Sequence, residues 1–178
     1  MKEIFFTTSQ QKILAFICEN VGEEFQEKEI SKKTGVKKSA VNLALHLLVK
    51  HKLISCRKIG RSSLYSADVK NNLIREMKIL LNILALEPLV EKLRLESIRI
   101  VLFGSFADGM NKKDSDIDIF VLTNSLNVVR KIINNSEFSE KIQLIVKTPN
   151  EMIKINKNKP LLFQEIEKGR VLWEKNED

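Results

Sequence analysis

The spacing of apolar residues predicts three helices in the N-terminal third of the chain. Residues 7–20 place apolar side chains on one face and open with a Thr and a Gln at the spacing of a capping box. Residues 26–36 predict a second helix that stops at Gly35, because glycine favours helix C-caps. Residues 37–54 predict a third helix, with apolar residues at i, i+4 and i+7. The apolar stripes of the first and third helices consist of Ile13, Phe16, Ile17, Val41, Leu45 and Leu48.

Strand-like patterns follow the third helix and recur in the C-terminal half of the chain. Residues 54–68 predict a β-hairpin around Gly60. Apolar or alternating runs predict the strands of a mixed sheet, and they span residues 98–103, 116–122 and 141–147. In the last run, alternation places Gln143 on the face opposite Ile142, Leu144 and Val146. Apolar periodicity over residues 160–174 predicts a helix that packs on this sheet.

Between these two patterns, residues 71–95 predict a linker helix that is interrupted at Pro88. Its apolar stripe has 4-3-4 spacing and consists of Leu73, Met77, Leu80 and Leu84. The stripe suits either a dimer seam or packing within the same chain, and we expect a homodimer. The fold class is therefore mixed α/β (α+β), with a helical domain over 1–69, linker helices over 70–95 and a sheet domain with flanking helices over 96–178.

Composition limits the partners that such a protein can have. The chain has 178 residues, of which 43% are hydrophobic and 30% are charged, and its net charge is +7. This excess of positive charge indicates a polyanionic partner. The two cysteines lack CxxC spacing, which argues against a zinc site and a disulfide framework and favours a reducing cytoplasm. No apolar run has the length of a membrane span, so we expect no membrane association.

The positive charge is concentrated near the predicted third helix and hairpin. Residues 31–61 contain nine lysines and arginines and no acidic residue. A stretch of one sign at this length is typical of a surface that binds nucleic acid. The alternative is a small helical domain with a basic, solvated face.

Three helices followed by a basic hairpin resemble the winged helix-turn-helix DNA-binding domain of archaeal and bacterial regulators. The resemblance covers about residues 7–68. It implies that double-stranded DNA is a partner and that the third helix enters the major groove. The implied base-edge contacts come from Lys37, Lys38, Ser39 and Asn42. The implied hairpin contacts, to phosphate or the minor groove, come from Arg57, Lys58 and Arg61.

Residues 104–118, between two predicted strands, carry the strongest chemical signal in the chain. A strand ends at Gly104, a short helical turn starts at Ser105, and the next strand opens with Asp116 and Asp118. Side chains at i and i+2 share one face of a strand, about 7 Å apart along it. Two hard oxygen donors beside a Gly-Ser turn suit Mg²⁺ (or Mn²⁺) carrying a polyphosphate. Glycine also lets the backbone approach phosphate closely.

This motif resembles that of the nucleotidyltransferase superfamily of DNA polymerase beta and kanamycin nucleotidyltransferase, and especially its minimal nucleotidyltransferase branch. The matching positions are Gly104, Ser105, Phe106, Ala107, Gly109, Ser115, Asp116 and Asp118. The resemblance implies transfer of a nucleoside monophosphate from a nucleoside triphosphate to a hydroxyl group. The implied catalytic metal ligands are Asp116 and Asp118, and the implied nucleotide-binding residues are Gly104, Ser105 and Ser115. The acceptor stays open among a protein, such as the partner of a toxin–antitoxin pair, a small molecule and nucleic acid.

Gln143 occupies the position at which the family has its third carboxylate, and it offers a neutral oxygen instead of an anion. In the family, this acid completes one of two metal sites and helps to activate the attacking hydroxyl. Glu140 and Glu151 lie near it in sequence, but their spacing favours neither as a substitute. Two functions therefore remain: an active nucleotidyltransferase, and a transcription regulator whose impaired domain senses a nucleotide or supports dimerisation. The nearby lysines, which fit a triphosphate or a solvated loop, are Lys154, Lys157 and Lys159.

Overall fold

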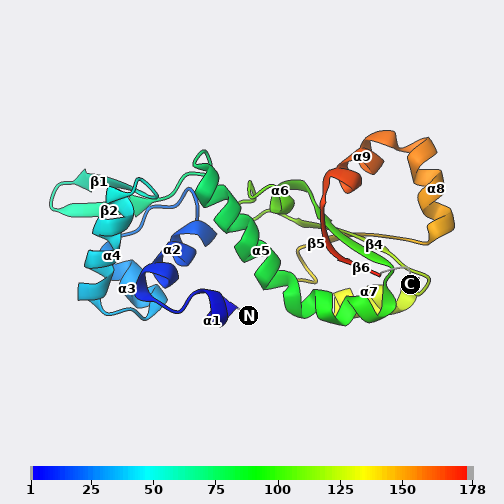
Figure 1. Ribbon diagram of the computed structural model, residues 1–178, viewed down its shortest axis with the longest axis horizontal. Coiled ribbons are helices and arrows are strands. Elements are labelled where there is room, and N and C mark those ends of the chain that lie inside the picture. The colour runs from blue at the N-terminus through cyan, green and yellow to red at the C-terminus, as the bar shows by residue number, and fades with distance from the viewer. Residues whose placement is uncertain (1, 176–178) are drawn as a thin grey trace. The chain divides into compact units, whose positions relative to one another are not determined.

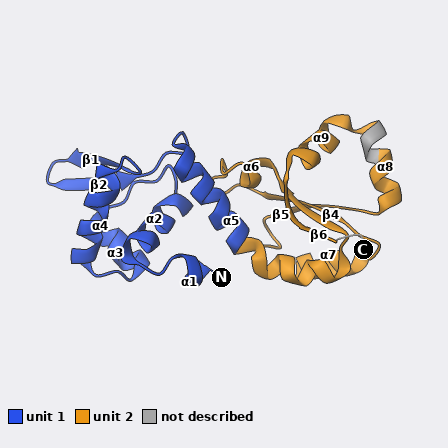
Figure 2. Ribbon diagram, in the orientation of Figure 1, with its two compact units in different colours: residues 1–84 blue, residues 85–178 orange. Residues whose placement is uncertain are grey.

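The computed structural model describes residues 2–175, with all of their side chains except those of residues 155–157. The chain divides into two compact units, residues 1–84 and residues 85–178 (Figure 2). Helix α5, Asn72–Leu93, runs across the boundary between them. No helix in the described part of the chain has the length and apolarity to cross a membrane.

The first unit contains the predicted helices followed by the predicted hairpin (Figure 1). Strands β1 and β2 pair in antiparallel register. The capping box forms at Thr8, whose hydroxyl accepts from the backbone N–H of Gln11 while the Gln11 side chain accepts from the backbone N–H of Thr8. The second predicted helix ends at Gly35, which is left-handed with φ 69°. The elements are α1 (Lys2–Phe5), α2 (Ser9–Glu19), α3 (Glu27–Thr34), α4 (Lys38–Lys50), β1 (Ser55–Ile59) and β2 (Ser62–Ser66).

The core of the first unit joins the helices to the hairpin. The apolar stripes of α2 and α4 are buried as the sequence predicts, with Phe16 at their edge and only partly buried. An isolated bridge between Phe25 and Tyr65 attaches β2 to the loop before α3. Tyr65 is itself buried in the core. The hairpin is therefore fixed to the helices and does not project as a free ribbon.

Helix α5 is continuous through Pro88, so the predicted interruption is wrong. Proline removes one backbone hydrogen bond, but the buried residues around it hold the helix in place. The predicted 4-3-4 stripe does not pack within the chain as a whole, because Leu73 and Leu80 are 69% and 37% exposed while Met77 and Leu84 contact the core. The buried side of the helix instead serves both cores. Ile74, Leu81 and Leu84 belong to the core of the first unit, and Leu86, Leu89, Val90 and Leu93 belong to that of the second.

The second unit is built on a mixed sheet with strand order β5-β4-β3-β6 in the described residues. Strand β4 pairs antiparallel with β3 and parallel with β5. The three predicted strands are present. The helix predicted over residues 160–174 is only half correct, because it stops at Lys168 and β6 follows. The elements are a 3-10 turn (Arg94–Glu96), β3 (Arg99–Phe103), α6 (Gly104–Ala107), β4 (Ile117–Leu122), α7 (Leu126–Asn134), β5 (Ile142–Lys147), α8 (Pro149–Asn158), α9 (Pro160–Lys168) and β6 (Arg170–Glu174).

Both faces of this sheet are covered, and β4 shows the division clearly. Its residues Ile117, Ile119 and Val121 pack with α7 and the end of α5. Its residue Phe120 points to the other face, where it packs with Ile166 of α9. Figure 1 shows α7 and the end of α5 on one side of the sheet and α8 and α9 on the other. Asp118, two residues before Phe120, therefore lies on the face that α8 and α9 cover.

Candidate functional site

Gly104 and Asp118 are packed against each other where β3 ends and β4 begins. The register pairs Phe103 directly with Asp118. Gly104 has a positive φ of 66°, a conformation that side chains other than glycine's rarely adopt. A Cβ added at Gly104 would overlap Oδ2 of Asp118 and would lie 3.2 Å from its Cγ. Glycine at this position is required both by the turn and by the carboxylate beside it.

Gln143 lies beside the acidic pair, as the sequence predicts. In the parallel pairing of β4 and β5, Gln143 is the register partner of Asp118. The Gln143 side chain donates a hydrogen bond from Nε2 to Oδ2 of Asp116 over 2.7 Å. The structure thus brings Asp116, Asp118 and Gln143 together on one face of the sheet.

Asp118 lies in a partly buried environment with two negative charges near it. Asp118 is half-buried, and its pKa is raised, first by burial and then by the negative charges of Asp116 and Glu165. A divalent cation relieves such repulsion and prefers carboxylate oxygens. Across the described residues, no group of three or more Asp, Glu, His or Cys is placed to hold a metal.

The Gly-Ser turn is closed by the loop that follows it. The backbone oxygen of Ser105 accepts from the N–H groups of Met110 and Asn111, at 2.9 and 3.2 Å. Ser115 has a local role in the same loop, where its hydroxyl accepts from the N–H of Lys112 over 2.8 Å. These bonds fix the loop that leads from the turn to the acidic pair.

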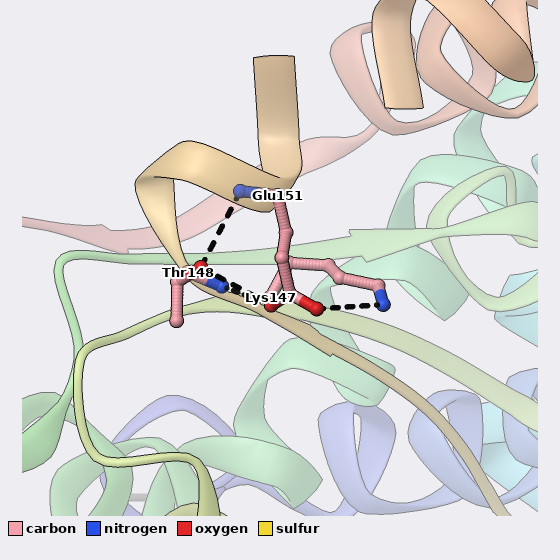
Figure 3. Close-up of polar contacts among 3 residues, drawn as sticks. All are labelled: Lys147, Thr148 and Glu151. Atoms are coloured by element: carbon pink, nitrogen blue, oxygen red, sulfur yellow. Dashed lines mark hydrogen bonds and ion pairs between the residues drawn. The ribbon is translucent and has the colours of Figure 1, made fainter. Parts of the chain in front are cut away.

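Glu151, one of the acids near Gln143 in sequence, is occupied elsewhere (Figure 3). Its carboxylate accepts from the backbone N–H of Thr148 over 2.9 Å, and its own N–H donates to the Thr148 hydroxyl, which makes a capping box at the start of α8. Lys147 pairs with it at 3.4 Å. The hydrogen bond from the Thr148 backbone is the largest cause that lowers its pKa. Glu151 therefore starts a helix and does not complete the acidic pair.

Glu165 is the acid that sequence reasoning missed. On α9 it precedes Ile166, whose fully buried side chain packs against Phe103 and Phe120. The charge of Glu165 acts on Asp118, although its side chain is exposed. Nothing in its local sequence marks it, because only the packing of α9 on the sheet brings it near the pair.

In the first unit, every residue predicted to contact DNA has an exposed side chain. Lys37 is the N-cap of α4, and its side chain is exposed. The exposed set consists of Lys37, Lys38, Ser39, Asn42, Arg57, Lys58 and Arg61.

Two acids from the segment around the start of α3 reach into this surface. Arg57 donates to Glu24, with Nε and Oε1 3.1 Å apart. Asn42 donates to Oε1 of Glu27 over 3.0 Å, and the Tyr65 hydroxyl donates to the same oxygen over 3.2 Å. The folded surface is therefore less uniform in sign than residues 31–61 alone indicate. Glu24 and Glu27 precede residue 31, so a count of charges over residues 31–61 does not include them.

The sequence profile of the family described as "Polymerase beta, Nucleotidyltransferase" matches residues 87–178, slightly more than half of the chain. The chain belongs to this nucleotidyltransferase family. The matched segment contains the Gly-Ser turn, the acidic pair and Gln143. Among curated proteins, no match was found.

Several solved bacterial proteins resemble part of the chain. HlyU from Vibrio cholerae N16961 shares 19% identity, with a TM-score of 0.36 over 43% of this chain and 80% of that one. A predicted DNA-binding transcriptional regulator from E. coli shares 20%, with a TM-score of 0.34 over 44% and 83%. NolR from Sinorhizobium fredii shares 19%, with a TM-score of 0.33 over 49% and 76%. The winged-helix arrangement itself rests on the order of helices and hairpin in the first unit.

Proposed function

We propose that this nucleotidyltransferase transfers a nucleoside monophosphate to a hydroxyl acceptor and binds duplex DNA through its winged helix. The nucleotidyl transfer is supported by the contact between Gly104 and Asp118. This contact places a backbone that phosphate can approach closely next to a carboxylate. The family membership supports the same chemistry. In the transfer, the acceptor oxygen bonds to the α-phosphorus as the bond to pyrophosphate breaks.

Each residue of the site has a role in this proposal. Asp116 and Asp118 would hold Mg²⁺ or Mn²⁺, which when bound neutralises the charge of the phosphates and the carboxylates. The backbone at Gly104 and the Ser105 hydroxyl would orient the phosphates of the nucleoside triphosphate. Ser115 would keep the loop closed behind them through its bond from Lys112. Gln143 would hold Asp116 in place.

A second candidate function is favoured by the bond between Gln143 and Asp116. An amide there supplies no anion to activate the acceptor, so the domain would bind nucleotide and transfer slowly or not at all. The protein would then be a regulator whose DNA binding responds to a nucleotide. Exposed Leu73 and Leu80 on α5 are the surface that a homodimer of either kind would use.

One experiment separates the two functions. The full chain is incubated with each labelled nucleoside triphosphate, Mg²⁺ and cell extract, and the products are resolved by size and charge. Label that moves to a protein, nucleic acid or small molecule, and that is lost in Asp116→Asn, supports transfer. Calorimetric binding of a triphosphate that needs Mg²⁺, without any labelled product, supports the regulator. Equal affinity with and without Mg²⁺ would count against the site itself.

A further inference from the structure

A polar pocket of about 350 Å³ opens in the first unit, where the starts of α3 and α4 meet the turn of the hairpin. The side chains of Lys28, Lys38 and Arg61 line it, and Glu27 lies among these cations. An acid on a surface that binds DNA repels the phosphates, so its presence there calls for a local function. The DNA binding proposed above gives Glu27 no role.

Glu27 orients the side chain of Asn42, which lies one turn after Lys38 on the same face of α4. Nδ2 of Asn42 donates to Oε1 of Glu27 over 3.0 Å. A carboxylate only accepts hydrogen bonds, so the side of the amide that is turned toward Glu27 must be the nitrogen. Asn42 is exposed, and its side chain makes no hydrogen bond with any other described residue. It therefore presents Oδ1 and the second hydrogen of Nδ2 to an approaching partner.

Glu27 is itself held by the core of the first unit. The hydroxyl of Tyr65 donates over 3.2 Å to the same oxygen that accepts from Asn42. Tyr65 is 4% exposed, and burial is the main cause that raises its pKa to about 12. The hydroxyl therefore keeps its proton at neutral pH and remains a donor to Glu27. Two hydrogen bonds thus connect the buried Tyr65 to the exposed amide of Asn42.

The groups that Asn42 presents, one acceptor and one donor, match a single base. In the major groove, adenine offers N7 as an acceptor and the N6 amino group as a donor. Guanine offers two acceptors, cytosine offers a donor, and thymine offers an acceptor beside a methyl group. Only adenine can therefore form two hydrogen bonds with the amide at the same time.

We propose that Asn42 contacts an adenine in the major groove and that Glu27 is the residue that positions its amide for this contact. The inference rests on the proposed binding of duplex DNA through the winged helix. Oδ1 accepts from N6 of the adenine, and the second hydrogen of Nδ2 is donated to N7. Without Glu27 the amide rotates freely, so each binding event has to order it again at a cost in entropy.

The test uses the full chain and a library of random DNA duplexes. The wild type selects its preferred sequence, and fluorescence anisotropy then compares that duplex with one in which the selected A·T pair is changed to G·C. The wild type should discriminate between them by about 5- to 100-fold, the worth of one bidentate base contact. Replacing the selected adenine by 7-deazaadenine, which lacks the N7 acceptor, should weaken binding of the wild type and leave Asn42→Ala unaffected.

Variants of Glu27 separate the positioning of Asn42 from a general effect of charge. Glu27→Gln keeps an oxygen that accepts from Asn42, so it should retain the discrimination and bind every duplex more tightly. Glu27→Ala loses the acceptor as well as the charge, so its discrimination should fall by about two- to tenfold. Glu23→Ala, which removes an exposed acid of the same segment, is the matched control and should keep the discrimination of the wild type. Circular dichroism must show equal folding of all variants.

Two outcomes would overturn this inference and leave the proposed DNA binding in place. One is a preferred sequence in which no adenine responds to Asn42→Ala. The other is a discrimination that Glu27→Ala leaves at the wild-type value, since Asn42 would then need no positioning. Failure of the wild type to bind any duplex at low salt would instead remove the proposed DNA binding, and this inference with it.

Discussion

Gln143 donates its amide hydrogen to Oδ2 of Asp116 across two parallel strands, with 2.7 Å between the two heavy atoms. An amide in this place satisfies the carboxylate when no cation is present and adds no negative charge of its own. The pair therefore keeps one anion fewer than the family's pattern requires. In the proposed function, this position decides between nucleotide transfer and nucleotide binding alone.

Gln143→Asp should raise nucleotide transfer, because it supplies the missing anion at the side of the acceptor. Removing such a group typically costs about 10²–10⁴-fold, so adding one should give a comparable gain in the rate of labelled product. Gln143→Asn is the control, since it shortens the side chain without adding charge. Circular dichroism must show equal folding of all three proteins.

Two outcomes would contradict this prediction. Equal inactivity of all three proteins, with triphosphate still bound, would favour the regulator. Brisk transfer by the wild type that is lost in Glu165→Gln or Glu140→Gln would show that another acid fills the third position.

Gly104→Ala should destabilise the protein and abolish binding of the triphosphate. The left-handed backbone costs an alanine about 1–2 kcal/mol, and the overlap with Asp118 adds about 1–3 kcal/mol. Gly60→Ala, in the β1–β2 turn, is the control, because φ there is 56° but no atom lies within 4 Å of the added Cβ. Urea unfolding and calorimetry measure the two effects. Equal losses of stability in both variants would mean that the carboxylate moves aside freely.

DNA binding should depend steeply on salt and on the hairpin. Each phosphate contact contributes about 0.9 to the slope of log affinity against log salt, so replacing Arg57, Lys58 and Arg61 by Ala should weaken binding to every sequence and flatten that slope. Asn42→Ala should instead change the preferred sequence, since it lies on the helix expected in the major groove. Fluorescence anisotropy at several salt concentrations measures both. No binding to duplex DNA at low salt would refute the winged-helix proposal.

Glu24→Gln should tighten DNA binding by roughly two- to fivefold, because it releases Arg57 and removes a negative charge next to the DNA phosphates. Glu23→Gln removes the same charge from the neighbouring exposed residue and leaves the Arg57 pair intact. The ratio of the DNA affinities of the two variants gives the effect of breaking the Arg57–Glu24 ion pair, because both variants lose one negative charge. Identical affinities would show that Arg57 leaves Glu24 without cost.

Asp118→Asn should stabilise the protein at neutral pH in the absence of divalent cation. The pKa of Asp118 is raised above its ordinary value of 3.8, so the folded state holds the proton more tightly than the unfolded state. Stability is then lost as the pH rises from about that value through the folded pKa. The melting temperatures of wild type and variant should converge in acid and separate toward neutral pH. Asp114→Asn, an exposed change in the same loop, should show no such separation.

The sequence predicted those parts of the fold that local patterns determine. The capping box at Thr8, the glycine end of the second helix and the alternation of the C-terminal strands each depend on residues a few positions apart. The common face of Asp116, Asp118 and Gln143 follows from the same alternation together with the parallel pairing of two strands.

The features that the sequence did not predict depend on packing between distant segments. Residues 170–174 continue a helical apolar period, but Gly169 ends α9 and the edge of β3 offers unpaired backbone groups to a strand. Burial on both sides of Pro88 outweighs the one hydrogen bond that proline removes from α5. Glu24, Glu27 and Glu165 reach their partners only after the chain folds, so neither charge counts nor motif spacing reveals them.

Helix α5 contributes buried residues to each of the two hydrophobic cores, and it is continuous between those of the first core and those of the second. Helix formation is cooperative, so a half of α5 that one core has ordered favours the helical state of the other half. Heating should therefore melt both units in one calorimetric transition. A cavity made at Leu86 should lower the melting temperature reported by a probe placed in the winged helix. Severing the chain after Leu84 would deprive both fragments of this mutual support at once.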